Sequence, residues 1–420
     1  MRIENLRFEH SDGRSRIGAD VIWEDCDRPQ QYVFFETDAS FADSLTLDAN
    51  AFLVGCFVPA HAHRERRLRV AGEVCPELVY GITTALNWLR FWGAQPTPHD
   101  ITIEGDHSAR YPSPSPRSAR AAVFLSGGID SLACLRANRL TYPLDHPHAF
   151  KDALVVYGQN WESDSRPATF ATAVEALSEV AFDAGVTLVP IYTNIRDLDP
   201  TPDLFLYKSH GALLASVGHA LSSRLTTVSI GSTGYDLPTL LSLNERAGTH
   251  PVLDIHYSSR TLRIHHDDIG LSRLQKTRLL ANWDVGLRNI RVCGKAWPGT
   301  NCGECEKCLR TMLALLVSNA LHRSPMFQRV ELTPKVLREH LKLGYLSFPF
   351  YAELVAPLRE IGRADLAKVV ENSIARYKLD GRFRRSIKAF DRDFLNGAIR
   401  GLKNRLTVSL RSPIVVRHTP

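Results

Sequence analysis

The stretch that decides the fold is Ala121-Ala-Val-Phe-Leu-Ser-Gly-Gly-Ile-Asp-Ser131. Its first five residues are apolar and predict a buried strand, and a helical pattern begins at Asp130. The two glycines between them allow a tight backbone turn that brings N–H groups close to a ligand. Strand, glycine loop and helix in this order predict a nest for phosphate or pyrophosphate at the carboxyl end of a parallel strand. The residues that would surround the phosphate are Ser126, Gly127, Gly128, Asp130 and Ser131.

Two better-known phosphate loops do not fit this stretch. A Walker A loop ends in Gly-Lys followed by Ser or Thr, which is missing here, and the dinucleotide fingerprint needs a third spaced glycine. A simpler interpretation is a glycine turn before a helix, with Asp130 and Ser131 acting only as cap residues. The order of strand, turn and helix favours the phosphate loop over this simpler interpretation.

The region from Ala121 to about Arg323 repeats the pattern of apolar strand, turn and helix. Its strands are nearly continuous apolar runs, as in a parallel sheet that helices cover on both faces. We therefore expect an α/β fold with a doubly wound parallel sheet over residues 121–323. The expected strands are Ala121–Leu125, Ala153–Tyr157, Thr187–Tyr192 and Thr226–Ile230, and the expected helices are Asp130–Leu140, Thr169–Ala184, Lys208–Leu221 and Arg273–Trp283.

Four of the eight cysteines are clustered near the end of this region. Cys293, Cys302, Cys305 and Cys308 have the spacing C-x8-C-x2-C-x2-C, and four thiolates in a tetrahedral array form a structural zinc site. An iron–sulfur cluster also uses C-x2-C-x2-C, but here the fourth cysteine lies upstream and no Cys-Pro follows, so zinc is favoured. The other cysteines are scattered and predict buried thiols. They are Cys26, Cys56, Cys75 and Cys134.

Ser126-Gly-Gly-Ile-Asp-Ser131 resembles the signature of the PP-loop ATP pyrophosphatases. Together with the cysteine pattern that ends Cys302-Gly-Glu-Cys-Glu-Lys-Cys308-Leu-Arg, it resembles the QueC family of 7-cyano-7-deazaguanine synthases, over roughly half of the chain. The resemblance implies a PP-loop (adenine nucleotide α-hydrolase-like) sheet, the cofactors ATP and Mg²⁺, and zinc on the four cysteines beside the active site. It implies that Asp130 orients the leaving pyrophosphate through magnesium. The residues implied to hold that pyrophosphate are Ser126, Gly127, Gly128 and Ser131.

Enzymes of this family use ATP to activate an oxygen of a deazaguanine carboxylate, and ammonia then gives an amide and later a nitrile. Residues 231–238 stand where the family has a glycine-led loop, and Ser272–Lys276 stands where it has a lysine-bearing helix start. The predicted catalytic residues are Asp130 and Lys276, with Lys276 neutralising phosphate charge as AMP forms. A solvated lysine on a helix face is the alternative for Lys276.

The departures from the family pattern concern the substrate. Lys208-Ser-His-Gly211 replaces the family's Arg-Asn motif at the start of the third helix, and long segments flank the resembling region. The layout is similar to longer QueC-like proteins of anti-phage defence islands, some of which are thought to act on a partner protein. We expect a C–N ligase whose acceptor is a deazaguanine-like small molecule or a protein, with a macromolecular partner docking on the N- and C-terminal regions.

Two other function classes stay open. A tRNA-modifying PP-loop enzyme of the thiolation type would need a persulfide-competent cysteine outside the zinc set. Cys134, one helical turn after Asp130, is the candidate, although a small buried thiol is its commoner role. A non-catalytic nucleotide-binding scaffold would bind ATP without releasing pyrophosphate.

The flanking regions carry no chemical motif. Residues 1–110 predict a small α+β domain, residues 111–120 a Pro- and Ser-rich linker, and residues 324–420 a helical region with a basic tail. The elements expected in the N-terminal domain are strands at Asp20–Trp23, Tyr32–Phe35 and Ala51–Pro59 and a helix at Pro76–Trp92. Those expected after residue 324 are helices at Thr333–Leu341, Tyr351–Ile361 and Leu366–Tyr377.

The net charge of +6 arises near the end of the chain. Residues 376–420 hold 12 basic and 3 acidic residues, whereas the first 375 hold 39 and 42. Nucleic acid can therefore be expected only on the basic tail, where a solvated helix face is the alternative. No apolar run reaches the ~20 residues of a membrane span, and the start lacks an apolar leader, so we expect no membrane contact and a cytoplasmic location.

Overall fold

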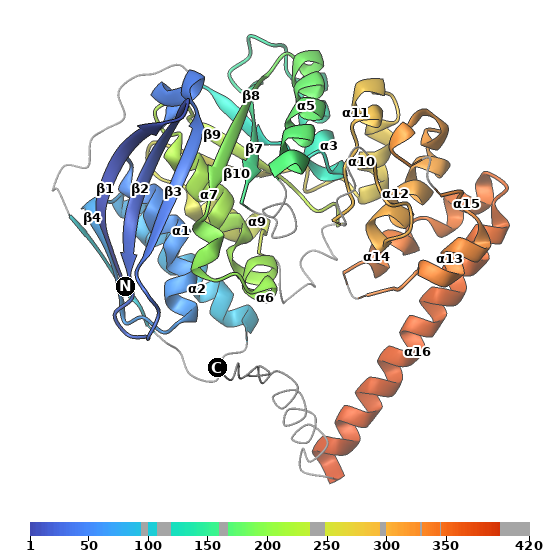
Figure 1. Ribbon diagram of the computed structural model, residues 1–420. Helices are drawn as coiled ribbons and strands as arrows, with labels where there is room; N and C mark the ends of the chain where they lie inside the picture. Colours follow the sequence, from blue (N-terminus) through green and yellow to red (C-terminus); the bar gives the residue numbers. More distant parts are fainter. Residues whose placement is uncertain are drawn as a thin grey trace, which may run out of the picture. The chain divides into compact units, whose positions relative to one another are not determined.

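A ten-stranded, mostly parallel sheet is the main feature of the computed structural model (Figure 1). The strands are β1 Arg2–Ser11, β2 Arg14–Ile22, β3 Gln31–Asp38, β4 Arg67–Glu73, β5 Thr102–Asp106, β6 Ala121–Phe124, β7 Phe150–Tyr157, β8 Thr187–Thr193, β9 Thr227–Gly231 and β10 Arg263–Asp267. Their order in the sheet is β10-β9-β6-β7-β8-β3-β2-β1-β4-β5. The pairs β8–β3, β3–β2 and β2–β1 are antiparallel, and the other six are parallel.

The structure describes residues 1–93, 100–106, 119–158, 167–235, 248–294, 300–327, 330–344 and 346–394. The chain divides into two units, Met1–Leu332 and Thr333–Pro420, and each is described by itself. Of the predicted linker at 111–120, residues 111–118 lie outside the described residues, as do residues 395–420 of the predicted basic tail.

Helices flank the sheet in the first unit and make up the described part of the second. The first unit contains α1 Ala49–Ala62, α2 Pro76–Gly93, α3 Ile129–Thr141, α5 Pro167–Ala184, α6 Pro202–Leu204, α7 His210–Ala220, α9 Pro251–Asp254, α10 Arg273–Leu280, α11 Asp284–Arg288 and α12 Glu306–Val317. Its short 3-10 helices are η1 Ala39–Ser44, η2 Ile195–Leu198, η4 Ile255–Tyr257, η5 Leu321–Arg323 and η6 Pro325–Phe327, and η3 Phe205–Ser209 is π-helical. The second unit contains α13 Pro334–His340, α14 Phe348–Ala352, α15 Val355–Glu360 and α16 Ala364–Phe394.

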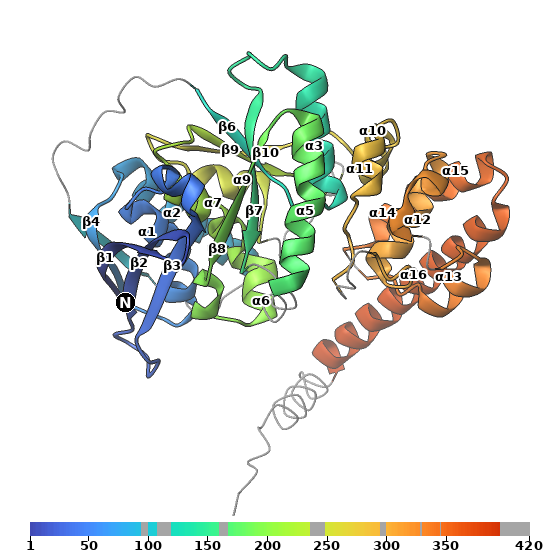
Figure 2. The ribbon, with the colours of Figure 1, turned by 45° about the horizontal axis from the view of Figure 1, so that its top comes forward.

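The strand order of the parallel part of the sheet, β6 to β10, reverses at β6. Counted from β6 as the first strand, their order across the sheet is 3-2-1-4-5, so the chain moves outward on one side through β7 and β8 and on the other through β9 and β10. Figures 1 and 2 show α3 and α5 on one side of these strands and α1, α2 and α7 on the other. The arrangement is compatible with the expected doubly wound α/β sheet, and it places the carboxyl ends of β6 and β9 beside each other, where such sheets bind ligands.

The four strands and four helices expected between residues 121 and 283 are all present, with ends that differ by a few residues. In the N-terminal region the expected strands at Asp20–Trp23 and Tyr32–Phe35 overlap β2 and β3, and the expected helix at Pro76–Trp92 is α2. The expected strand at Ala51–Pro59 is wrong, because these residues lie in α1. A continuous apolar run suits a buried helix as well as a buried strand, and Asp48 caps this helix by accepting a hydrogen bond from the Asn50 amide.

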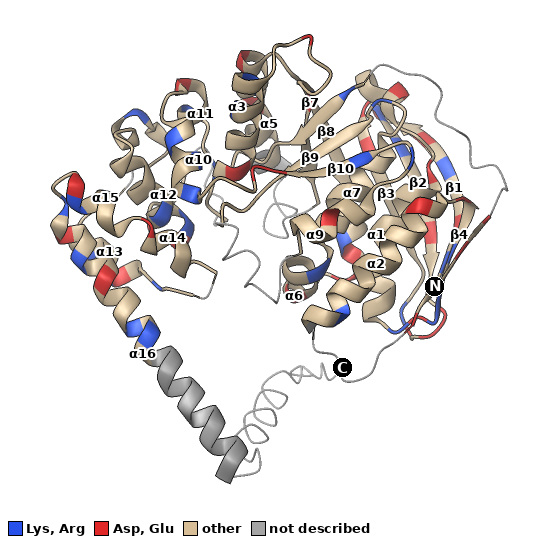
Figure 3. Ribbon diagram, turned by 180° about the vertical axis from the view of Figure 1, so that it is seen from behind, with Lys and Arg blue, Asp and Glu red and all other residues tan. Residues whose placement is uncertain are grey.

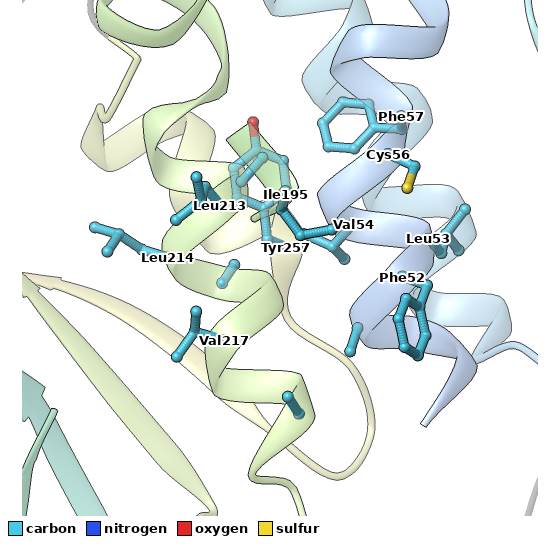
Figure 4. Packing of buried hydrophobic residues seen from close by; sticks show 14 of the residues in the cluster. Phe52, Leu53, Val54, Cys56, Phe57, Ile195, Leu213, Leu214, Val217 and Tyr257 are labelled. Atoms are coloured by element: carbon cyan, nitrogen blue, oxygen red, sulfur yellow. The ribbon is translucent and has the colours of Figure 1, made fainter. Parts of the chain in front are cut away.

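Two apolar helices, α1 and α7, pack against each other in the core (Figure 4). Every residue from Ala49 to Ala60 and from Gly211 to Ala220 is buried, so neither helix has a polar face for solvent. Gly55 of α1 faces η2 and allows it to approach closely, because a Cβ there would lie 3.0 Å from the side chain of Ile195. A helix without a polar face has to be shielded from solvent on all sides, and α1 packs against one side of α7.

The N-terminal strands extend the α/β sheet at the junction of β3 and β8. Phe35 pairs with Thr193, and the Thr193 hydroxyl donates to the Phe34 carbonyl oxygen at 2.6 Å. The Asn194 side chain closes the junction, since Oδ1 accepts from the Phe34 amide at 2.9 Å and Nδ2 donates to the Tyr32 carbonyl oxygen at 2.8 Å. Residues 1–106 therefore share one sheet and one core with strands β6 to β10.

In the second unit, one expected helix is divided in two. The sequence predicts a helix over Tyr351–Ile361, and the structure instead has α14 and α15 separated at Glu353 and Leu354. Pro357 explains the break, because proline has no N–H to donate to the carbonyl four residues earlier and is tolerated in a first helical turn. Among the helices that the structure describes, none combines the length and apolarity needed to cross a bilayer.

We expect Asn194→Ala to lower the free energy of unfolding by about 1–3 kcal/mol, because it removes both partners that close the β3–β8 junction. Urea unfolding followed by circular dichroism measures the change. Asn87→Ala is the matched control, since the exposed Asn87 side chain accepts only a 3.4 Å contact from Arg90. Equal destabilisation by the two substitutions would show that Asn194 does not hold the junction.

Candidate functional site

The loop after β6 turns sharply at Gly127. Its φ angle of +78° lies in the left-handed region that favours glycine, and a Cβ there would come 3.3 Å from the Cβ of Arg291. The Ser126 and Ser131 hydroxyl oxygens lie 3.2 Å apart, and Ser131 Oγ donates to the Gly128 carbonyl oxygen at 3.1 Å. The five residues predicted to surround a phosphate are therefore brought together in one turn, closed by its own hydroxyl groups.

Helix α3 begins directly after this turn. Gly128 is its N-cap and offers no side-chain acceptor, so the first N–H groups of the helix have no cap from that residue. These N–H groups and the helix dipole favour an anion at the loop. Asp130 in the first turn adds a negative charge at the same place, and a nearby cation is needed before a phosphate can approach.

Arg273 supplies that cation. It lies in the first turn of α10, and its Nη1 donates to Asp130 Oδ2 at 2.6 Å. A capping box formed by Ser272 and Gln275 fixes the start of this helix, so the arginine is held in place. The second carboxylate oxygen of Asp130, Oδ1, is buried and has no hydrogen-bond partner among the described residues. Asp130 therefore keeps one oxygen for a ligand or a cation.

Lys276 is fully buried one turn further along α10. Its Nζ donates to the Ser232 carbonyl oxygen at 2.6 Å, in the turn that follows β9. Burial lowers the pKa of Lys276, and the carboxylates of Asp130 and Asp268 oppose that shift. The alternative of a solvated lysine is wrong, because the side chain is inside the protein. The predicted contact with phosphate stays a prediction, and the observed contact anchors the turn after β9.

The turn after β9 packs directly against the phosphate loop. A Cβ at Gly231 would lie 2.8 Å from the Asp130 carbonyl oxygen, and one at Gly234 would lie 3.0 Å from the backbone of Arg273, so both glycines permit close approach. Tyr235 follows and is buried, which raises its pKa to about 12 against the opposing charges of Arg310 and Arg273. Residues 236–238 of the predicted glycine-led loop lie outside the described residues.

Cys293, Cys302, Cys305 and Cys308 converge on one point. Their sulfur atoms all lie within 4.8 Å of one another, and none of the four forms a disulfide. The Cys308 sulfur is 3.8 Å from that of Cys302 and 3.4 Å from that of Cys305. Four sulfurs bound at 2.3 Å around one tetrahedral metal ion would lie about 3.8 Å apart, so the cluster fits a single ion such as zinc.

The backbone around the cysteines is already arranged for binding. Asn301 Oδ1 accepts from the amides of Val292 and Cys293 at 3.0 and 3.1 Å, and its Nδ2 donates to the Ile290 carbonyl oxygen. The Cys305 amide donates to the Cys302 sulfur at 3.3 Å, which favours a thiolate there. These bonds hold the two halves of the cluster together across residues 295–299, which lie outside the described residues.

One hydrogen bond connects the cysteine segment to the phosphate loop. The Arg291 amide, two residues before Cys293, donates to the Gly127 carbonyl oxygen at 2.8 Å. On the other side of the cluster, α12 begins right after Cys305 and carries Arg310, whose charge acts on Tyr235. Figure 3 marks the positions of the basic residues along the ribbon of α10 and α12 in blue. The loop, Arg273 and the four clustered cysteines therefore form one region at the carboxyl edge of β6 and β9.

Other residues singled out in the sequence lie outside this region or inside the core. Cys134 is buried in α3, and burial raises its pKa well above the usual value, so its thiol is poorly suited to act as a nucleophile. Lys208 lies in the π-helical segment η3 and is half-buried. Of the basic tail, residues up to 394 continue α16.

Sequence reasoning did not single out Arg273, Arg291 or Tyr235. Arg273 could have been found, because Ser272 and Gln275 form a recognisable capping box that puts the next residue in the first helical turn. Arg291 carries no such signal, since its place depends on a backbone hydrogen bond to a residue 164 positions earlier. Tyr235 is a single aromatic residue after a glycine turn, and only the folded chain places it beside Arg310 and Arg273.

No family model matches the chain, and no curated protein or solved structure shows a significant similarity to it. The assignment of this region therefore depends on its geometry and on the sequence resemblance described above.

We expect the purified chain to carry one metal ion, and Cys305→Ser to reduce the metal content to about a tenth or less, because one of four thiolates is lost. Elemental analysis of the dialysed protein measures the content. Cys26→Ser is the control, since that half-buried cysteine lies outside the cluster. Full metal content in Cys305→Ser, or loss of metal in Cys26→Ser, would contradict the assignment.

Proposed function

We propose that the chain is an ATP-dependent C–N ligase of the PP-loop pyrophosphatase type, similar to the QueC family. The observation that carries the proposal is the meeting of the Ser126–Ser131 loop with Arg273 and with the cysteine-bearing segment through the Arg291–Gly127 hydrogen bond. A glycine loop alone is common before helices. A glycine loop at the switch of winding direction, beside a four-cysteine cluster, is the combination that the resemblance predicts.

In the proposed reaction, a carboxylate or amide oxygen of the acceptor attacks the α-phosphorus of ATP. The bond between the α-phosphorus and the bridging oxygen breaks, pyrophosphate leaves with the electron pair, and AMP is joined to the acceptor oxygen. Ammonia or another amine then attacks the acceptor carbon, loses a proton and displaces AMP. For an activated acid this gives an amide. An activated primary amide needs no second amine: its nitrogen loses two protons as AMP leaves the carbon, and a nitrile is formed.

The residues of the loop would bind the departing pyrophosphate. The first N–H groups of α3 and the hydroxyls of Ser126 and Ser131 are the donors, and donors fixed before reaction stabilise charge at no cost of reorganisation. Arg273 neutralises Asp130 on one oxygen and leaves the other for Mg²⁺. When bound, Mg²⁺ would offset phosphate charge. These roles use Asp130 Oδ1, which has no hydrogen-bond partner among the described residues, and they require the Ser131 hydroxyl to turn from the Gly128 carbonyl oxygen to the ligand.

The metal at the four cysteines is proposed to be zinc with a structural role. All four positions of a tetrahedral ion would be filled by cysteine, so none is left for a substrate. The ion would hold the Cys293–Cys308 segment, and through Arg291 it would hold the phosphate loop. Zinc predicts a colourless protein, and visible absorption with bound iron would contradict it.

An amine is favoured over sulfur as the second nucleophile. Of the described cysteines outside the cluster, Cys134 is the one nearest the loop in sequence, and it is buried with a raised pKa. The acceptor is proposed to be a deazaguanine-like small molecule or a protein, within an anti-phage defence system. We also propose that a macromolecular partner docks on the flanking regions, that nucleic acid binds the basic tail and that the protein is cytoplasmic.

We expect Asp130→Ala and Ser131→Ala to lower production of AMP and pyrophosphate by at least about a hundredfold without loss of fold, because their groups face the loop. The assay incubates the chain with ATP, Mg²⁺ and candidate acceptors and detects every product by mass spectrometry. The exposed Asp145→Asn is the control. Wild-type turnover in both variants would end the phosphate-loop assignment, whereas ATP binding without pyrophosphate release would indicate a scaffold.

Arg273 and Lys276 are expected to respond differently to substitution. Arg273→Gln should abolish turnover with little change in stability, because it frees Asp130 near the loop. Lys276→Met should change the unfolding midpoint, because it removes the buried bond to the Ser232 carbonyl oxygen. Thermal unfolding and turnover are measured for both, and identical effects on the two readouts would contradict the division of roles.

A further inference from the structure

A cavity of about 260 Å³ lies at the far end of α3 from the phosphate loop. The carboxyl-terminal part of α3 lines it with Arg136 and Arg139, and the end of α5 lines it with Phe182 and Asp183. Leu144 and Trp283 complete the rim and the wall. Arg139 lies ten residues after Ile129, which at 1.5 Å per residue is roughly 15 Å along the helix, so a small ligand here would not touch the loop.

The two arginines present hydrogen-bond donors that no described residue accepts. Arg139 Nη2 donates to the Asn138 side chain and to the Phe150 carbonyl oxygen, but its Nε and Nη1 are buried without a partner. Arg136 Nε is buried without a partner as well, and its guanidinium lies 5.6 Å from the centre of the Trp283 ring. Buried donors on a charged group are costly unless an acceptor satisfies them.

No described carboxylate neutralises these two cations. Asp183 is the acid of the cavity, and its Oδ2 accepts from Trp283 Nε1 at 2.6 Å instead of pairing with an arginine. Burial lowers the pKa of Arg139, as expected for a cation without a counter-ion. The cavity therefore holds more positive than negative charge and favours an acidic group.

The mouth of the cavity is apolar. Phe182 is 90% exposed and Leu144 57% exposed, although both are large hydrophobic side chains at the rim of a charged hollow. Pockets for small ligands combine an apolar lining with a few polar groups that fix orientation. An occupant that fits both features has an acidic end for the arginines and a flat apolar part for the rim.

We propose that this cavity binds a small organic anion, a phosphate or carboxylate attached to a planar ring, with the acid on Arg136 and Arg139 and the ring against Phe182. The site is separate from the proposed nucleotide site. The cavity is lined by the end of α3, the helix that begins at the phosphate loop. It is also lined by Trp283, which follows the end of α10, the helix that carries Arg273. A ligand here would contact α3, which carries Asp130, and Trp283 in the segment that follows α10.

The probe is phenyl phosphate, titrated into the full chain and followed by calorimetry. Saturable binding with a Kd below about 1 mM is expected, and Arg139→Gln should weaken it at least about tenfold. Arg278→Gln removes the same charge from an exposed position of α10 outside the cavity and should leave binding unchanged. Ser131→Ala, in the phosphate loop, should leave it unchanged too.

Three results would overturn the proposal. One is the absence of saturable binding, which would mean that water satisfies the arginines. Another is equal affinity for inorganic phosphate, which would remove the role of the apolar rim. The third is weaker binding in Ser131→Ala but not in Arg139→Gln, which would place the probe in the loop. Circular dichroism of each variant separates loss of binding from loss of fold.

Discussion

The hydrogen bond between the Arg291 amide and the Gly127 carbonyl oxygen is the interaction on which the candidate site depends. It connects the phosphate loop, which needs a glycine at position 127 because φ is positive there, to the segment that begins at Arg291. Asn301 holds that segment beside the cysteine cluster by accepting hydrogen bonds from the amides of Val292 and Cys293. Without a metal ion, nothing would bind the four sulfur atoms to one point, and the Asn301 contacts beside them would be less constrained. The phosphate loop would then lose its neighbour, since nothing else described bonds the Gly127 carbonyl. A metal bound 164 or more residues away in sequence can in this way keep the loop in shape for phosphate.

Charge balance limits what the region can bind. Arg273 and Lys276 face Asp130 and Asp268, so the buried cluster carries two positive and two negative groups before any ligand arrives. A pyrophosphate would make it strongly negative, and a buried negative excess is unfavourable. Additional positive charge has to come with the ligand, as a divalent cation, or from Arg291, whose half-buried side chain lies against Gly127. For the proposed phosphate site, this charge balance favours a metal–phosphate complex over a free anion.

The sequence predicts the local parts of this arrangement well, because local signals encode them. The strand, loop and helix at Ala121–Ser131 and the cysteine spacing are recognisable within short windows, and the structure contains both. The helix α1 was predicted as a strand, since an apolar run without polar alternation has no period to identify it. The joining of β3 to β8 was not predicted, because side chains about 160 residues apart make it. The roles of Arg273 and Arg291 depend on the same kind of distant contact.

Burial of the α/β core explains why the N-terminal region is present. Helix α7 is buried on every side from Gly211 to Ala220, and the N-terminal helix α1 covers one of those sides, while β3 continues the sheet from β8. Residues 1–106 are therefore required to bury the core, whether or not anything docks on them. Their outer sheet face is already occupied by its own pairs, such as Arg16 on Phe34 and Arg14 on Tyr192, with Glu36 bonding both arginines. A docking partner is therefore not needed to explain the described N-terminal strands.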